Sequence, residues 1–157
     1  MGAVIGGERM ARIPLTVSNG QVQARATILA PDVKRVETLT FLVDTGSSSV
    51  VLSQRDAERL GVDVPALPRS GIPRLGYGGR MDAGVLRHSL IALKDSDGMS
   101  VSVPLEEVVV NRATTPKQQD LRQVYSIPSV LGTDVLIAGD LALYAHLNKT
   151  IAYLESG

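Results

Sequence analysis

The chain has 157 residues, 44% of them hydrophobic, so it is the size of one domain and long enough to bury a core. Sixteen basic and sixteen acidic residues give zero net charge, and no Lys/Arg block indicates a nucleic-acid or membrane-surface partner. The absence of cysteine excludes disulfides and thiolate chemistry, and no apolar run approaches the roughly 20 residues that span a bilayer.

The first part of the chain predicts strands. Aromatic residues make up only 3% of the chain, whereas aliphatic residues abound, which favours a sheet on an aliphatic core. Alternating patterns over 13–17 and 22–28, joined by Asn19-Gly20, predict an antiparallel hairpin with one solvent-facing side. Ala30-Pro31-Asp32 ends the hairpin, and 36–43 predicts a strand that becomes wholly apolar at its end.

We expect a single domain over residues 13–157, preceded at 1–12 by a flexible lead-in or an edge strand. The lead-in lacks the apolar middle of a signal peptide. The lack of cysteine fits a reducing compartment such as the cytoplasm, and an anchored or exported form is left open.

A carboxylate on a hydroxyl-rich turn follows the strand at 36–43. The turn is Asp44-Thr45-Gly46-Ser47-Ser48, and a second apolar run at 50–52 comes directly after it. These are ordinary turn residues, but a solvated hairpin turn rarely lies between two apolar runs. A charged group in such a place needs hydrogen bonds, which the hydroxyls and backbone can donate, so we regard Asp44 as a candidate site residue.

The middle of the chain predicts a short helix and a second hairpin. Ser53 and Asp56 form a capping-box pattern for a helix over 54–60, which Gly61 ends. Three prolines make 64–73 irregular or an edge segment, and three glycines in 75–80 predict a tight turn.

Strands at 85–93 and 99–110 are joined by a turn at 95–98. Neighbouring Glu106 and Glu107 point to opposite faces of such a strand, so we expect both to be solvated.

The last third predicts mixed elements. A polar segment at 111–125 allows a short exposed helix over 117–124. The apolar stretch 127–131 precedes a helix at 134–138, which Thr133 is expected to cap and Gly139 to end. Residues 141–146 and 150–154 form a closing hairpin.

Three of these segments, in this order, resemble the retropepsin-like aspartic proteases of the single-domain bacterial or cellular type rather than the retroviral type. They are the Asp-Thr-Gly turn, the glycine-rich 75–80, and Leu-Gly-Thr-Asp-Val-Leu at 131–136. The resemblance extends over about 13–154. It implies a mainly β, closed acid-protease fold with one or two short helices, acting as a homodimer.

The resemblance also implies roles for individual residues. It implies that Asp44 is the catalytic residue and that the turn residues Thr45, Gly46 and Ser47 support it. It implies a flap that covers the substrate, formed by Gly76, Tyr77, Gly78 and Gly79. It also implies that the structure behind the turn includes Leu131, Gly132 and Asp134. Val50 and Leu75 would line the subsites and favour apolar peptides. An ion pair of the retroviral enzymes is absent, because Thr133 and Ser48 occupy its two positions.

Aspartic peptidases need two carboxylates about 3 Å apart that share one proton. This chain has one such turn, so the resemblance implies a symmetric homodimer with one Asp44 from each subunit, acting on a peptide or protein substrate. The Ser47 hydroxyl could donate to the carboxylate and lower the apparent pKa values of the pair, which predicts an acid-shifted activity profile. The C-terminal hairpin around Ile151 and Tyr153, with the N-terminal segment, is the expected interface.

No cofactor or metal is expected. His88 and His146 lie in strand-like segments without further ligands at metal-binding spacing. The alternative to an endopeptidase is a non-proteolytic module that uses the same groove for peptide binding or the same dimer for assembly.

Overall fold

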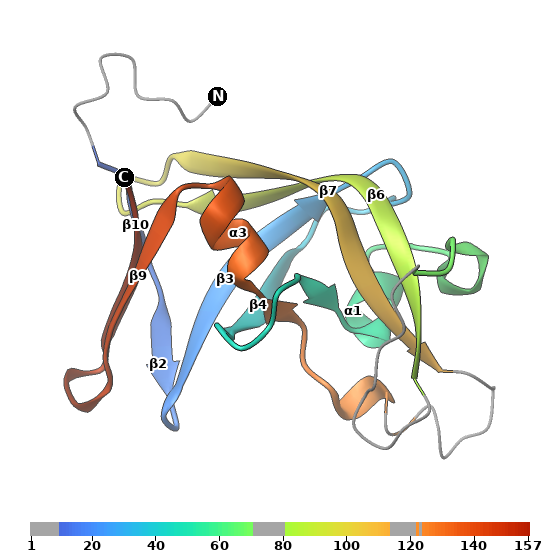
Figure 1. The fold of residues 1–157 in the computed structure, drawn as a ribbon, viewed down its shortest axis with the longest axis horizontal. Helices are drawn as coiled ribbons and strands as arrows, with labels where there is room; N and C mark the ends of the chain where they lie inside the picture. Colours follow the sequence, from blue (N-terminus) through green and yellow to red (C-terminus); the bar gives the residue numbers. More distant parts are fainter. Residues whose placement is uncertain (1–9, 71–80, 114–121, 123) are drawn as a thin grey trace.

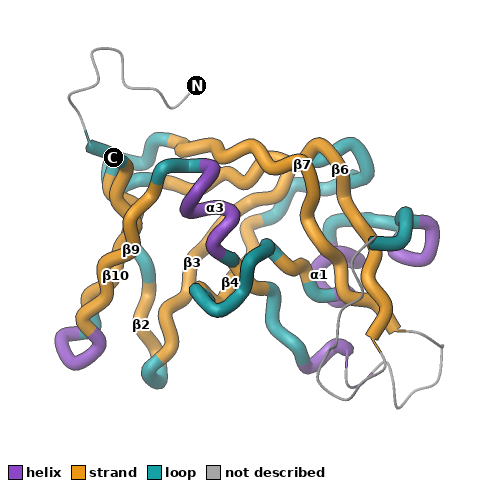
Figure 2. Tube along the Cα trace, in the orientation of Figure 1, coloured by secondary structure: helices purple, strands orange, loops and turns teal. Residues whose placement is uncertain are grey.

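A computed structural model of the chain describes residues 10–70, 81–113, 122 and 124–157, and Figure 1 shows the fold. Strands dominate the described part, and its α-helical segments are short (Figure 2). The mainly β class expected from the aliphatic, aromatic-poor composition is therefore confirmed. None of the described helices is long and apolar enough to cross a membrane.

The larger sheet has the strand order β2-β3-β4-β8-β5-β7-β6. Its strands are β2 (Thr16–Ser18), β3 (Gln21–Leu29), β4 (Thr38–Val43), β5 (Val51–Leu52), β6 (Met81–Lys94), β7 (Ser100–Ala113) and β8 (Val130–Leu131). Because β3 pairs with β6 as well as with β4, the sheet closes on itself, as the fold prediction required.

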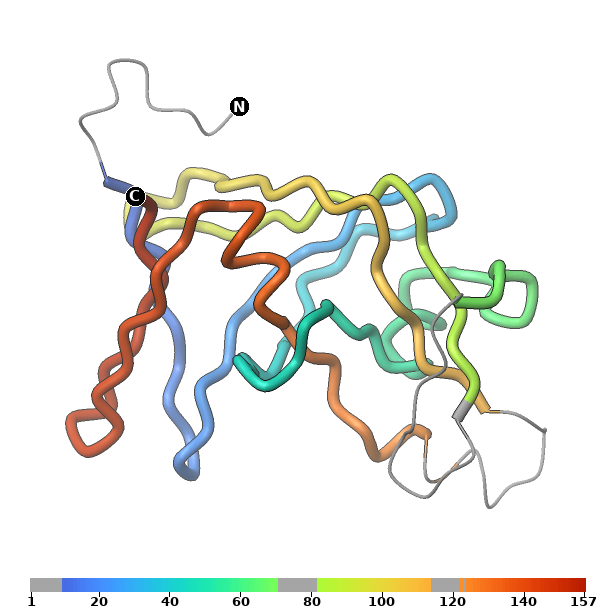
Figure 3. The backbone as a smooth tube through the Cα atoms, in the orientation of Figure 1, coloured from blue at the N-terminus to red at the C-terminus, as the bar shows by residue number. Residues whose placement is uncertain are grey.

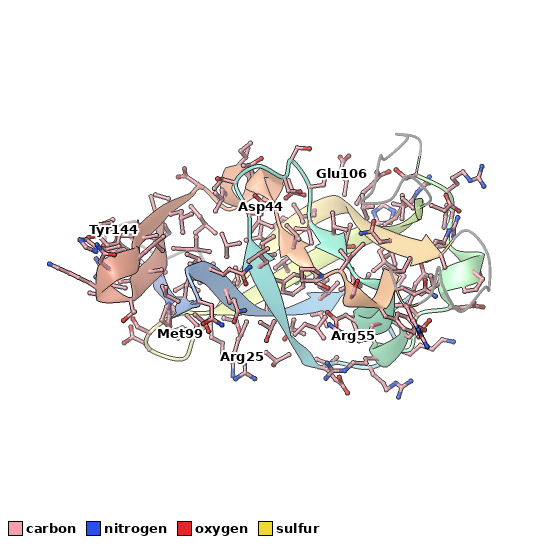
Figure 4. All side chains as sticks on the ribbon, turned by 90° about the horizontal axis from the view of Figure 1, so that it is seen from below. Arg25, Asp44, Arg55, Met99, Glu106 and Tyr144 are labelled. Atoms are coloured by element: carbon pink, nitrogen blue, oxygen red, sulfur yellow. The ribbon has the colours of Figure 1, made fainter. Side chains whose placement is uncertain are left out.

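A smaller sheet has the order β1-β10-β9, with β1 (Arg12–Pro14), β9 (Leu141–His146) and β10 (Ile151–Ser156). One face of β10 carries Ala152 and Leu154, both buried against the core. The opposite face carries Ile151 and Tyr153, and the Tyr153 ring stacks on Tyr144 of β9 with their centroids 4.9 Å apart. The β9–β10 hairpin lies at one side of the molecule in Figure 1, and Tyr144 is labelled at that end in Figure 4.

Helix α1 comprises Gln54–Arg59 and helix α3 comprises Thr133–Ala138, and short 3-10 turns occur at η1 (Val64–Ala66) and η2 (Leu147–Lys149). The Ser53 side chain caps α1 as predicted, because it accepts the Asp56 N–H. The predicted cap of α3 is wrong: Gly132 is the N-cap residue and Thr133 is the first helical residue. Gly132 has the extended backbone of an N-cap residue, and the N–H of Thr133, in the first turn, donates to the Ser47 carbonyl at 2.8 Å.

The predicted hairpins are confirmed, with two differences in their extent. Asn19 and Gly20 adopt φ values of 52° and 74°, as a two-residue hairpin turn between β2 and β3 requires. The strand predicted over 13–17 is two strands, because β1 pairs with β10 and β2 pairs with β3.

The polar segment predicted from 111 begins later, since β7 continues through Ala113 opposite the first residues of β6. Most of the helix predicted over 117–124 lies outside the described residues, and 124–126 are helical.

The core is aliphatic, as predicted, with Phe41 its one phenylalanine. Buried side chains from β3, β4, β6 and β7 meet inside the closed sheet, and Leu131 and Val135 pack against them from β8 and α3. Val50 is fully buried in this core. The expectation that Val50 lines a substrate cleft is therefore wrong for the isolated chain.

Candidate active site

Asp44 follows the last residue of β4, where the chain turns outward. β4 runs parallel to β8, and this pairing continues past the strand, because the Asp44 N–H donates to the Leu131 carbonyl at 3.0 Å. The turn and α3 lie side by side in the trace of Figure 3. In Figure 4, Asp44 lies on the opposite side of the molecule from Arg25. The two-residue strand β8 thus sets where Asp44 leaves the sheet.

The turn holds the Asp44 side chain through its own backbone. The Gly46 N–H donates to Asp44 Oδ1 at 2.8 Å, and the Ser47 N–H donates to the Asp44 carbonyl at 3.1 Å. A Cβ on Gly46 would lie 3.1 Å from Asp44 Oδ1, so the absence of a side chain there leaves the carboxylate room. Asp44, Thr45 and Gly46 are all exposed in the single chain.

Ser47 does not make the contact that the sequence suggested. Its hydroxyl donates to the Ser49 carbonyl, at 2.8 Å, and so stabilises the second half of the turn. The hydroxyl has a single proton to donate, so it leaves the Asp44 carboxylate without that bond. An acid-shifted activity profile caused by Ser47 therefore has no contact in this structure to carry it.

The segment after β8 packs against the back of the turn. The Asp134 carboxylate accepts the Val50 N–H at Oδ2 and the Val135 N–H at Oδ1, each at 2.9 Å. Both oxygens are thus directed at backbone donors, one of them just beyond the turn. Both carboxylate oxygens of Asp134 are therefore occupied by backbone N–H groups.

A small apolar cavity of about 10 Å³ lies between the start of the Asp44 turn, α3 and β10. It is lined by Val43, Asp44, Thr45, Leu131, Gly132, Val135, Leu136 and Leu154. Asp44 is the one carboxylate in this lining. This cavity therefore brings no second carboxylate to the Asp44 turn.

The other residues considered in the sequence are reported in turn. Gly76, Tyr77, Gly78 and Gly79 of the expected flap lie outside the described residues, as does Leu75. Glu106 and Glu107 are exposed, as expected. No cluster of three or more metal-ligating side chains occurs among the residues that the structure describes.

An ion pair holds the ends of β6 and β7 together. Arg112 Nε donates to Asp82 Oδ2 at 2.9 Å, and Arg112 Nη1 donates to the carbonyls of Val64 and Leu67. Burial raises the pKa of Asp82, but the hydrogen bonds from Arg112 and the Ala83 N–H, with the charge of Arg112, outweigh it, so the pKa lies below its ordinary value. The pair thus joins the strand ends to η1.

Sequence reasoning missed two buried polar residues near the turn. Ser129 is 1% exposed and Asp56 is 5% exposed, and the Ser129 hydroxyl donates to Asp56 Oδ2 at 2.7 Å. Asp56 was identified only as part of a helix cap. The available signal was the position of Ser129 directly before the apolar Val130-Leu131, where a polar residue is unexpected unless it is bonded.

Comparisons with known proteins bear on the family and on the fold. The model of the family described as aspartyl protease matches residues 31–135. No curated protein was found to match the chain. A retropepsin-like aspartic protease from Rickettsia conorii has a similar structure, with a TM-score of 0.61 and 18% sequence identity, covering 94% of this chain and 92% of the other. That likeness shows a retropepsin-like fold.

Two further structures are similar at lower scores. EIAV protease in complex with the inhibitor HBY-793 has a TM-score of 0.44 and 19% identity, covering 91% of this chain and 100% of the other. The retroviral protease-like domain of Ddi1 from Leishmania major has a TM-score of 0.42 and 17% identity, covering 92% and 93%.

Proposed function

The chain belongs to the aspartyl protease family, and on that premise we propose that it is an aspartic endopeptidase whose site forms from the Asp44 turns of two identical subunits. The observation that carries the proposal is the position of Asp44. Asp44 lies on an exposed turn at the end of β4, its carboxylate held by the Gly46 N–H, and the chain carries this Asp-Thr-Gly turn once. A second copy of the same turn supplies the missing partner by two-fold symmetry.

The chemistry follows from two carboxylates at short distance. Two carboxyl groups about 3 Å apart cannot both be ionised, because their negative charges repel each other. The pair therefore holds one proton and supplies one base and one acid. The base takes a proton from water as the water oxygen attacks the peptide carbonyl carbon. The acid then protonates the leaving amine as the C–N bond breaks, and the pair titrates as a unit. No metal or cofactor takes part in this scheme.

The homodimer interface is proposed to include the outward face of the small sheet and the exposed side of α3. Four of the eight exposed large hydrophobic residues in the described chain belong to these elements or to the turn between β9 and β10: Ile137 in α3, Tyr144 in β9, Leu147 in η2 and Ile151 in β10. β9 is an edge strand of the small sheet, so its outer backbone groups can pair with another strand. An apolar surface next to an open edge fits a second copy of the chain.

Cleavage of a mixed peptide library by wild type and by Asp44→Asn tests the proposal. Asparagine keeps an oxygen for the Gly46 N–H but cannot act as the base, so we expect the variant to lose at least about 1000-fold in kcat/KM. Asp32→Asn, in the exposed turn after β3, is the matched control and should cleave like wild type. Both variants should elute as dimers at the assay concentration.

Equal cleavage by Asp44→Asn and wild type would contradict the assignment of Asp44. A dimer that binds peptides but leaves them intact at every pH from 3 to 8 would instead support the non-proteolytic module.

A further inference from the structure

Ser129 connects three segments of the chain at one buried point. Its carbonyl accepts the Leu42 N–H at 2.9 Å, two residues before Asp44. Its hydroxyl accepts the Ser53 N–H at 2.9 Å, at the junction of β5 and α1. The same hydroxyl donates its proton to Asp56 Oδ2 at 2.7 Å. One side chain thus links the strand before the catalytic turn to the strand and helix after it.

The bonds around Ser129 form a closed ring of three residues. Ser53 donates its N–H to Ser129, Ser129 donates its hydroxyl to Asp56, and Asp56 donates its N–H to the Ser53 hydroxyl at 3.1 Å. Ser53 is 0% exposed, and the other two members are nearly as buried. Hydrogen bonds to a buried carboxylate are about twice as strong as neutral ones, so the ring has little freedom to rearrange.

The ring matters for the site because β8 is only two residues long. β8 makes a parallel pairing with β4 and a single antiparallel pairing, Val51 with Val130, to β5. So short a strand is not held in place by its ladder alone. It is anchored after its last residue by the bonds of Thr133 and Asp134, and before its first residue by Ser129.

We propose that Ser129 and Asp56 are positioning residues that fix β8 and, through the Leu131 carbonyl, the place where the Asp44 carboxylate meets its symmetry mate. The inference rests on the proposed function. In a symmetric dyad, a shift of the turn occurs in both subunits, so the distance between the two carboxylates changes by up to twice that shift. A misplacement of about 1 Å in an active site can cost a factor of about 100 in rate.

Steady-state kinetics of the homodimer test this role with matched serine variants. Ser129→Ala removes the centre of the ring, and Ser89→Ala removes another buried hydroxyl, which donates to the Leu86 carbonyl in β6. We expect Ser129→Ala to lower kcat about 10- to 100-fold with KM within about threefold of wild type, and Ser89→Ala to leave both nearly unchanged.

A milder variant guards against loss of folding. Asp56→Asn keeps an acceptor for the Ser129 hydroxyl but removes the charge, so a kcat loss of about 2- to 10-fold is expected. If both folded ring variants have wild-type kcat, or if Ser89→Ala loses as much kcat as Ser129→Ala, the positioning role is wrong.

Amide hydrogen exchange separates this inference from the proposed function. In Ser129→Ala, exchange at the Leu42 and Asp44 amides should rise at least about tenfold while the amides of β10 stay near their wild-type rates. Equal increases throughout the core would mean general destabilisation and would overturn the proposal. This readout needs no substrate, so it remains decisive even if the wild-type protein cleaves nothing.

Discussion

Gly132 shows how closely the single residues of the site are packed. A Cβ at this position would lie 2.5 Å from the Ser49 carbonyl oxygen and 2.6 Å from the Ser47 carbonyl oxygen. Both neighbours are backbone atoms, which cannot turn away as the end of a side chain can. The turn after Asp44 therefore rests directly on the backbone before α3, and a glycine is required by this contact.

Gly132→Ala is expected to push the turn away from α3. Overpacking of this kind costs about 1–3 kcal/mol of folding free energy, and the shift should lower kcat/KM at least about tenfold. Urea denaturation and peptide cleavage measure the two effects. Thr133→Ala is the neighbouring control, since the Thr133 side chain makes no capping bond, and it should change the free energy of unfolding by less than about 0.5 kcal/mol.

Among the elements, the start of β6 and the end of β7 are joined by the ion pair between Asp82 and Arg112. Arg112 is 12% exposed and Asp82 is 23% exposed at the side chain, so solvent screens their ion pair only in part. Arg112 also bonds the carbonyls of η1. The contact therefore links the long hairpin to the segment that precedes it.

The lowered pKa of Asp82 predicts how this contact depends on pH. The ordinary pKa is 3.8, and the folded value lies below it, so the stabilisation is fully present above about pH 3.8 and is lost as pH falls through the folded value. Asp82→Asn should be less stable than wild type by an amount that stays constant from pH 5 to 7 and shrinks at lower pH. Urea titrations at each pH provide the measurement.

A gap between wild type and Asp82→Asn that widens toward pH 3 would contradict the sign of the shift.

The elements differ in how far the sequence predicts them. The hairpin at Asn19-Gly20 and the cap by Ser53 depend on neighbouring residues, and both are confirmed. The break at Leu15, the end of β7 and the cap of α3 depend on partners distant in sequence, and the predictions failed there. The predicted bond from the Ser47 hydroxyl to the Asp44 carboxylate also failed, because the sequence pattern does not distinguish that acceptor from the Ser49 carbonyl.

At the scale of the whole molecule, the outward face of the small sheet is unusual for this chain. Two of its four tyrosines stack there, and the Arg12 guanidinium lies 4.0 Å above the Tyr153 ring centroid. Arg12 also pairs with Glu155 at 2.8 Å. This face therefore presents the stacked Tyr144 and Tyr153 rings next to the edge strand β9. Aromatic side chains in such a place suit the proposed homodimer contact.

Ile151→Asp should weaken the proposed dimer. Burying a charge in an apolar contact raises the dimer dissociation constant, by at least about tenfold, and activity should recover as the protein concentration is increased. Analytical ultracentrifugation and kcat/KM measured over a concentration series give the two readouts. Val36→Asp is the control, since Val36 is 70% exposed in the loop between β3 and β4. An unchanged dissociation constant for Ile151→Asp would place the interface elsewhere.

The bond from the Asp44 N–H to the Leu131 carbonyl has a consequence for biosynthesis. A ribosome adds about 5–20 residues per second, so the partner of the Asp44 turn follows it by on the order of ten seconds. Until then the turn lacks β8, Gly132 and Asp134, and the strands that precede it have no closed sheet to join. The Asp44 turn therefore reaches the packing described above only after residues 131–134 have been made.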